Sequence, residues 1–165
     1  MNDKKPIKRN QAIVEFSKDH HFALLFVWKI REGVRKSIDP SRMIPYALHF
    51  FDFELISHFK EEEELLFNKL PINNNLRIRA EEDHKNIRQL IDSLRKNLKD
   101  SELLEELVTT LEKHIRFEER ELFNHLQEAL PNEVLKDVAS SLKSRNHPPK
   151  NEWHDAFWLD KDAKV

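Results

Sequence analysis

The sequence predicts an all-α protein, an up-down-up-down antiparallel four-helix bundle with a short fifth helix and a C-terminal tail. Two observations carry this prediction. Long segments with apolar residues at helical spacing are separated by prolines and polar turns, and the 165 residues include a single glycine, Gly33. β-Sandwiches and barrels need many glycine-bearing turns, and a phosphate-binding loop needs several glycines. Most β folds, Rossmann folds and P-loop enzymes are therefore excluded.

The first two long helices are expected at residues 17–37 and 41–70. The first has apolar residues at helical spacing and ends at Asp39-Pro40, because proline cannot continue a helix. The second ends at Pro71 and carries Pro45 near its start, where backbone donors have no partner within the helix.

The next two long helices are expected at residues 76–98 and 101–130. Asp100-Ser101 supplies the expected N-terminal cap of the second of these, and Pro131 ends it. The short connections between all four helices place successive helices antiparallel, and an up-down-up-down bundle is the simplest result.

The expected organisation has four parts: an N-terminal arm (1–16), the bundle (17–130), a short C-terminal helix within 131–146, at about 133–142, and a tail (147–165). The tail contains aromatic residues, and we expect them to pack on the same chain rather than on a second one. These residues are Trp153, Phe157 and Trp158.

The composition of the chain excludes several classes of partner and all chemistry that depends on cysteine. The net charge of −2 predicts no nucleic-acid partner, and no apolar run approaches the roughly 20 residues of a membrane span. The absence of cysteine excludes disulfides, thiolate zinc sites, iron–sulfur clusters and cysteine nucleophiles. The start of the sequence does not resemble a secretory signal, so the expected location is the cytoplasm.

An internal repeat points to the chemistry. Residues 58–70 (HFKEEEELLFNKL) and 114–126 (HIRFEERELFNHL) are identical at seven of 13 paired positions, at a constant offset of 56. The helices before them also correspond, with Asp19-His20 matching Asp83-His84 at an offset of 64. The chain therefore looks like two helical hairpins related by a pseudo-two-fold axis.

Within each repeat a histidine and a glutamate are four residues apart, so they share one helix face. Leucines border that face, so it is expected to point into the bundle, where an unpaired glutamate is costly. A pair of iron or manganese ions would satisfy four histidines and two glutamates there, and the ligand types also allow zinc. The candidate ligands are His20, His58, Glu62, His84, His114 and Glu118. The rest of the Glu61–Glu64 run is expected on a mostly solvated face.

The order H, H-x3-E, H, H-x3-E resembles the hemerythrin-like (HHE cation-binding) family over about residues 17–130. Arg88 stands four residues after His84, where oxygen-carrying hemerythrins have histidine, and Glu118 replaces a more widely spaced aspartate. Both departures resemble the bacterial-type branch rather than the carriers. The resemblance implies two non-haem iron ions with four terminal histidines, two bridging glutamates and an oxo or hydroxo bridge.

Two further residues are possible additional ligands. Glu54 lies four residues before His58 on the same stripe, and His21 is adjacent to His20. We expect a protein that binds or senses a small diatomic ligand, oxygen or nitric oxide, or that handles iron, rather than an enzyme. The alternatives are a di-iron redox enzyme, of ferroxidase or peroxidase-like type, and a zinc-binding structural or interaction module.

Overall fold

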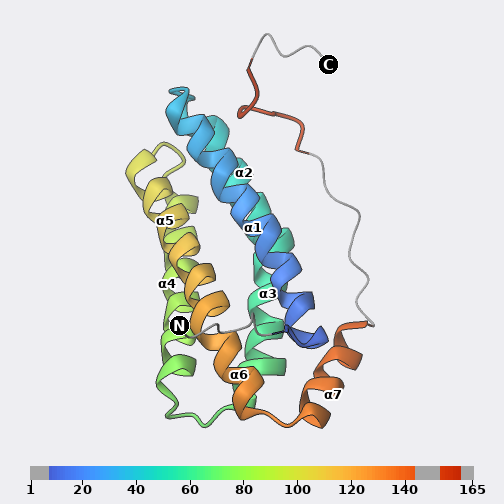
Figure 1. The fold of residues 1–165 in the computed structure, drawn as a ribbon. Helices are drawn as coiled ribbons and strands as arrows, with labels where there is room; N and C mark the ends of the chain where they lie inside the picture. Colours follow the sequence, from blue (N-terminus) through green and yellow to red (C-terminus); the bar gives the residue numbers. More distant parts are fainter. Residues whose placement is uncertain (1–7, 144–152, 161–165) are drawn as a thin grey trace, which may run out of the picture.

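The computed structural model describes residues 8–143 and 153–160 (Figure 1). Every regular element in this part of the chain is helical, which confirms the all-α prediction. The elements are α1 (Gln11–Arg35), α2 (Pro40–Phe50), η1 (Phe51–Leu55), α3 (Ile56–Glu61), η2 (Glu62–Leu66), η3 (Phe67–Lys69), α4 (Asn75–Lys96), α5 (Ser101–Phe117), η4 (Glu118–Leu122), α6 (Phe123–Ala129) and α7 (Asn132–Lys143). Parts of the expected arm, short helix and tail lie outside the described residues.

Within the described residues, consecutive helical elements join end to end into four rods, which are α1, α2 to η3, α4, and α5 to α6. The rods lie side by side, with α7 beside the N-terminal end of α1 (Figure 1). None of the helices in the described ranges is long and apolar enough to cross a bilayer.

The buried interior consists of two apolar clusters. One contains Phe26, Ile30 and Leu111, and the other contains Phe16, Leu66 and Phe123, on other parts of the same rods. The buried polar residues fall between the two clusters along the rods. A polar layer is therefore enclosed by apolar side chains on two sides.

Helix α1 begins at Gln11, six residues before the expected start at residue 17. Asn10 caps it by accepting a hydrogen bond from the backbone N–H of Ala12, and Ile13 and Phe16 are fully buried in the cluster that includes α7 residues. Residues 11–16, expected in an arm, are thus helical because α7 buries their apolar face. The short helix itself is found close to its expected position.

Two rods contain π-helical segments that the sequence did not predict. The second rod has η1 and η2, and the fourth has η4. Segments η2 and η4 begin at Glu62 and Glu118, which are equivalent positions of the repeat. Single π-helical turns within α-helices are frequent at functional sites.

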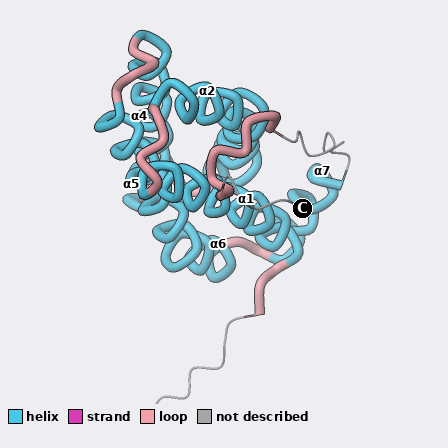
Figure 2. The backbone as a smooth tube through the Cα atoms, turned by 90° about the horizontal axis from the view of Figure 1, so that it is seen from above, coloured by secondary structure: helices cyan, strands magenta, loops and turns pink. Residues whose placement is uncertain are grey.

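Residues 153–160 of the tail pack on the same chain, as expected, and cross α1 and α2 (Figure 2). Phe157 is buried, and its ring lies 5.6 Å from that of Tyr46 between ring centroids. Asp155 accepts two hydrogen bonds from Arg42, at 2.7 and 2.9 Å. A Cβ at Gly33 would collide with Met43 Sδ and lie 2.9 Å from Phe157 Cδ2, so only glycine leaves room for this contact.

Candidate metal centre

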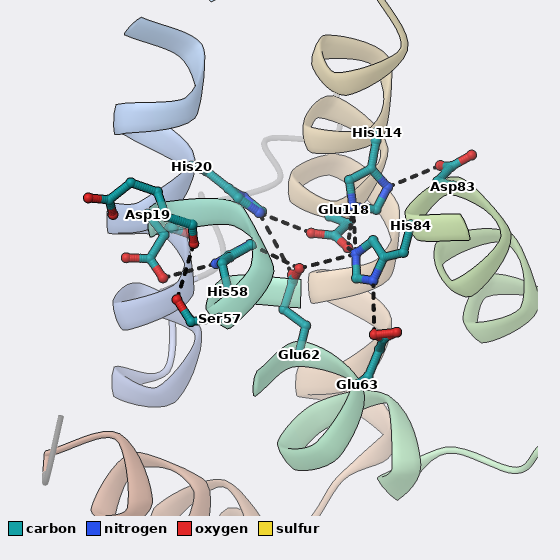
Figure 3. Close-up of polar contacts among 12 residues, drawn as sticks. Asp19, His20, Ser57, His58, Glu62, Glu63, Asp83, His84, His114 and Glu118 are labelled. Carbon is teal, nitrogen blue, oxygen red and sulfur yellow. Dashed lines mark hydrogen bonds and ion pairs between the residues drawn. The ribbon is translucent and has the colours of Figure 1, made fainter. Parts of the chain in front are cut away.

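The structure brings the six candidate ligands together in the buried polar layer (Figure 3). All four rods contribute, because α1 and α4 each supply one histidine and the other two rods each supply one histidine and one glutamate. Each of the six side chains is at most 5% exposed. They are His20 on α1, His58 on α3, Glu62 in η2, His84 on α4, His114 on α5 and Glu118 in η4.

The six residues form two groups that share both glutamates. The first group adds His20 and His58 to the glutamates, and the second adds His84 and His114. Within each group the potential ligand atoms all lie within 4.8 Å of one another. Two cations could therefore be held side by side, with the two carboxylates common to both.

The glutamate contacts follow the pseudo-two-fold relation of the repeats. Oε1 of Glu62 is 2.9 Å from His58 Nε2, and Oε1 of Glu118 is likewise 2.9 Å from His114 Nε2. Each glutamate also faces the other hairpin. Glu118 Oε2 lies 3.0 Å from His20 Nε2, and Glu62 Oε1 lies 3.3 Å from His84 Nε2.

The donor set fits metal cations. Both oxygens of Glu62 and of Glu118 are buried and make no hydrogen bond, although ion-pair contacts surround them, and the same is true of Nε2 of His20 and His58. Burial of such groups is costly unless they are hydrogen-bonded, paired or bound to metal. Imidazole nitrogens and carboxylate oxygens together suit iron, manganese or zinc.

Protons compete with metal cations for the groups of this layer. Burial opposes the charge of His20, but the nearby carboxylates of Glu118 and Glu119 outweigh burial and raise the pKa of His20 to about 10. Burial likewise opposes ionisation of Glu118, but His114, His20 and His84 hold the pKa of this carboxyl well below its usual value. Metal ligation requires neutral imidazoles, so a bound cation replaces these protons.

A second set of carboxylates lies behind the histidines, at the ring nitrogen Nδ1 that points away from the centre. His20 Nδ1 is 2.7 Å from Glu119, and His58 Nδ1 is 2.9 Å from Asp19. In the other half, His114 Nδ1 is 3.1 Å from Asp83, and His84 Nδ1 is 3.6 Å from Glu63. Such contacts fix the orientation of the ring, with Nε2 directed toward the shared glutamates.

Sequence reasoning did not assign these four carboxylates a role. The signal was present, because each is adjacent in sequence to a candidate ligand and recurs in the repeat. The expectation of a mostly solvated face beside Glu62 is wrong for Glu63, which is half-buried and contacts both His84 and Arg88.

The two possible additional ligands do not join either group. His21 and Glu54 are both exposed, and neither is in the buried layer. Aromatic rings line the layer instead. Phe59 stacks on His84 with 3.9 Å between ring centroids, and Phe123 stacks on His20 at 5.3 Å. These rings keep the histidines in a largely apolar surrounding.

Fold and site define the class: a helical protein with a buried cluster of histidine and glutamate that can hold metal cations. The family model of the hemerythrin HHE cation binding domain matches residues 12–126, well over half of the chain. The chain therefore belongs to the hemerythrin HHE cation-binding family, as the sequence resemblance indicated. No curated protein and no solved structure gives a significant match.

Proposed function

We propose that the protein is an up-down-up-down four-helix bundle that holds two non-haem iron ions and binds a small diatomic ligand, oxygen or nitric oxide. The observation that carries this proposal is the sharing of Glu62 and Glu118 by both histidine groups. Two carboxylates common to two sites favour a pair of cations over a single one.

The residues of the chain have distinct roles in this proposal. Each pair of histidines would bind one iron through Nε2, and Glu62 and Glu118 would each bind both irons. The carboxylates at Nδ1 orient the imidazoles. When bound, ferrous iron supplies electrons and coordination positions for the diatomic ligand.

The surroundings of the centre favour ligand binding over exchange with bulk water. The two apolar clusters enclose the polar layer, and the rings of Phe59 and Phe123 stack directly on ligand histidines. A small uncharged molecule crosses such a wall at lower cost than an ion, because it carries no charge to desolvate.

The test is metal analysis combined with absorption spectroscopy. The apoprotein is loaded anaerobically with ferrous iron, freed of excess metal, and then exposed to oxygen or nitric oxide. We expect about two irons per chain and new charge-transfer absorption on gas exposure. Removal of the gas should restore the ferrous spectrum if binding is reversible.

Three other results would contradict the proposal in different ways. A single iron per chain would refute the shared-carboxylate assignment. A purified protein that retains only zinc and cannot be loaded with iron would support a structural metal module. Consumption of ferrous iron or peroxide beyond one equivalent per site would support a redox enzyme.

A further inference from the structure

The two halves of the centre differ in the distance between Nδ1 of each histidine and the carboxylate oxygen that it contacts. In the group of His20 and His58, the Nδ1 contacts to carboxylate oxygens are 2.7 and 2.9 Å. In the group of His84 and His114, the corresponding distances are 3.6 and 3.1 Å. The largest difference is at His84, whose Nδ1 is buried and makes no hydrogen bond.

Arg88 accounts for this difference. Its guanidinium donates to both oxygens of Glu63, at 2.9 and 2.8 Å, and the oxygen nearest His84 is one of the two. In the other half, Leu24 is the repeat counterpart of Arg88 at the offset of 64 and cannot form such a pair.

Glu119, the carboxylate that contacts Nδ1 of His20, has no bidentate arginine partner of the kind that Glu63 has. Glu119 accepts a hydrogen bond from the neutral hydroxyl of Ser17 at 2.7 Å, and Arg9 lies 3.6 Å from its other oxygen. Neither contact prevents Glu119 Oε1 from approaching His20 Nδ1 to hydrogen-bond distance. The asymmetry therefore originates from the bidentate pair of Arg88 with Glu63.

A carboxylate that accepts a hydrogen bond from the far nitrogen of a ligand histidine makes that histidine a better electron donor to metal. A bidentate arginine donates hydrogen bonds to both oxygens of the carboxylate and partly neutralises its charge. The carboxylate then accepts a weaker hydrogen bond from the histidine. We propose that Arg88 makes the centre asymmetric, so that the cation at His84 and His114 binds more weakly than the cation at His20 and His58. This inference rests on the proposed two-ion centre.

The experiment is a titration of the apoprotein with zinc ions, followed by calorimetry and by NMR of the histidine side chains. We expect two binding steps with dissociation constants at least about tenfold apart, because loss of such outer contacts changes metal affinity by about 10–100-fold. The first equivalent should shift the signals of His20 and His58, and the second those of His84 and His114.

The decisive variant is Arg88→Leu, which places the residue of the other half at this position. Release of Glu63 should let it contact His84 and tighten the second step by about tenfold, with the first step unchanged. Arg88→Gln, which is also uncharged, should act in the same direction. Arg95→Leu is the matched control, because Arg95 lies on the same helix and pairs with the exposed Asp52, so both steps should be unchanged.

The outcomes separate this inference from the proposed function. Two zinc ions bound with equal affinity, or a second step that neither Arg88 variant tightens, would overturn the asymmetry and leave the two-ion centre intact. Filling of the His84 and His114 group first would also overturn it. Failure to bind a second ion under any condition would overturn both proposals.

Discussion

Glu62 and Glu118 differ from every other candidate ligand because each faces imidazoles of both hairpins. Loss of one histidine removes a donor from one group only. Loss of one glutamate removes a donor from both groups and leaves the surrounding imidazoles with one carboxylate fewer.

This difference predicts the effect of Glu118→Gln and of Glu62→Gln. Each variant keeps the volume of the side chain but loses the charge, so we expect bound metal to fall from two ions to one or fewer per chain. Inductively coupled plasma mass spectrometry measures this directly. Glu64→Gln, which alters an exposed neighbour, should retain both ions. Full occupancy in both buried variants would contradict the ligand assignment.

A second prediction at this scale concerns pH in the metal-free chain. The pKa of His20 is raised from 6.5 to about 10, so its stabilising contribution is complete below pH 6.5 and lost as pH rises through 10. The pKa of Glu118 is lowered, so the ionised carboxylate stabilises the fold above pH 4.5, and this stabilisation is lost as pH falls below 4.5. We therefore expect the apoprotein to be most stable between about pH 4.5 and 6.5.

Circular dichroism melting from pH 4 to 10, with chelator present, measures this profile. The metal-loaded protein should not lose stability over the alkaline range, because its imidazoles are neutral and protons no longer compete with the cation. Parallel profiles of the two forms would show that the buried layer is not protonated in the metal-free state.

The candidate ligands could be proposed from the sequence because their spacing within each helix is local. The repeat also marks the carboxylates that contact Nδ1 of these histidines, but their partners could not be assigned, because each contact depends on which helices are neighbours. His20 and Glu119, for example, are 99 positions apart. The Asp-His doublets were visible in the repeat, but the repeat does not say which histidine each aspartate contacts.

At the scale of elements, the sequence predicted the helices well and their irregularities poorly. Prolines and caps are local signals, and Asp100 caps α5 as expected. The early start of α1 follows from burial by α7, and the π-helical turns at Glu62 and Glu118 accompany the convergence of four rods on one layer. Both depend on tertiary packing, which helical periodicity does not contain.

The end of α1 gives a prediction at this scale. Ser37 has φ of 57°, in the left-handed region, and the N–H groups of Ser37 and Ile38 donate to the carbonyls of Val34 and Gly33. This is a Schellman motif, in which glycine is favoured at the position of Ser37. Ser37→Gly should therefore raise the free energy of unfolding by about 1 kcal/mol, or Tm by about 2–4 °C.

Thermal melting checks this, with Ser57→Gly as the control. Ser57 lies within α3, where glycine costs about 1 kcal/mol relative to good helix formers, so the control should be destabilised. A loss of stability in both variants would mean that the left-handed turn does not limit the end of α1.

At the scale of the whole molecule, the packing of the tail on α1 and α2 depends on the one glycine. Gly33→Ala would ordinarily stabilise a helix by up to about 1 kcal/mol, but the added methyl group collides with Met43 and Phe157. Both of those side chains are almost fully buried, and overpacking costs about 1–3 kcal/mol. We expect net destabilisation of about 1 kcal/mol and a Tm lower by about 2–4 °C.

A double-mutant cycle with Phe157→Ala isolates this contact. In the Phe157→Ala background the added methyl group has more room, so Gly33→Ala should cost less than it does in the natural sequence. Tryptophan fluorescence of the tail gives an independent measure, since both Trp153 and Trp158 contact Tyr46. Equal costs in the two backgrounds would show that Phe157 does not exclude a side chain at Gly33.

The cover of α1 by distant segments also affects the order of events during synthesis. Lys36, at the end of α1, donates a hydrogen bond to the carbonyl of Trp158, 122 residues later, and α7 buries the start of α1. At about 5–20 residues per second, translation takes on the order of 10 s to reach these segments. During that interval the apolar face of the first helix lacks its native cover. We therefore expect this face of α1 to reach its native burial only after residues 132–160 have emerged from the ribosome.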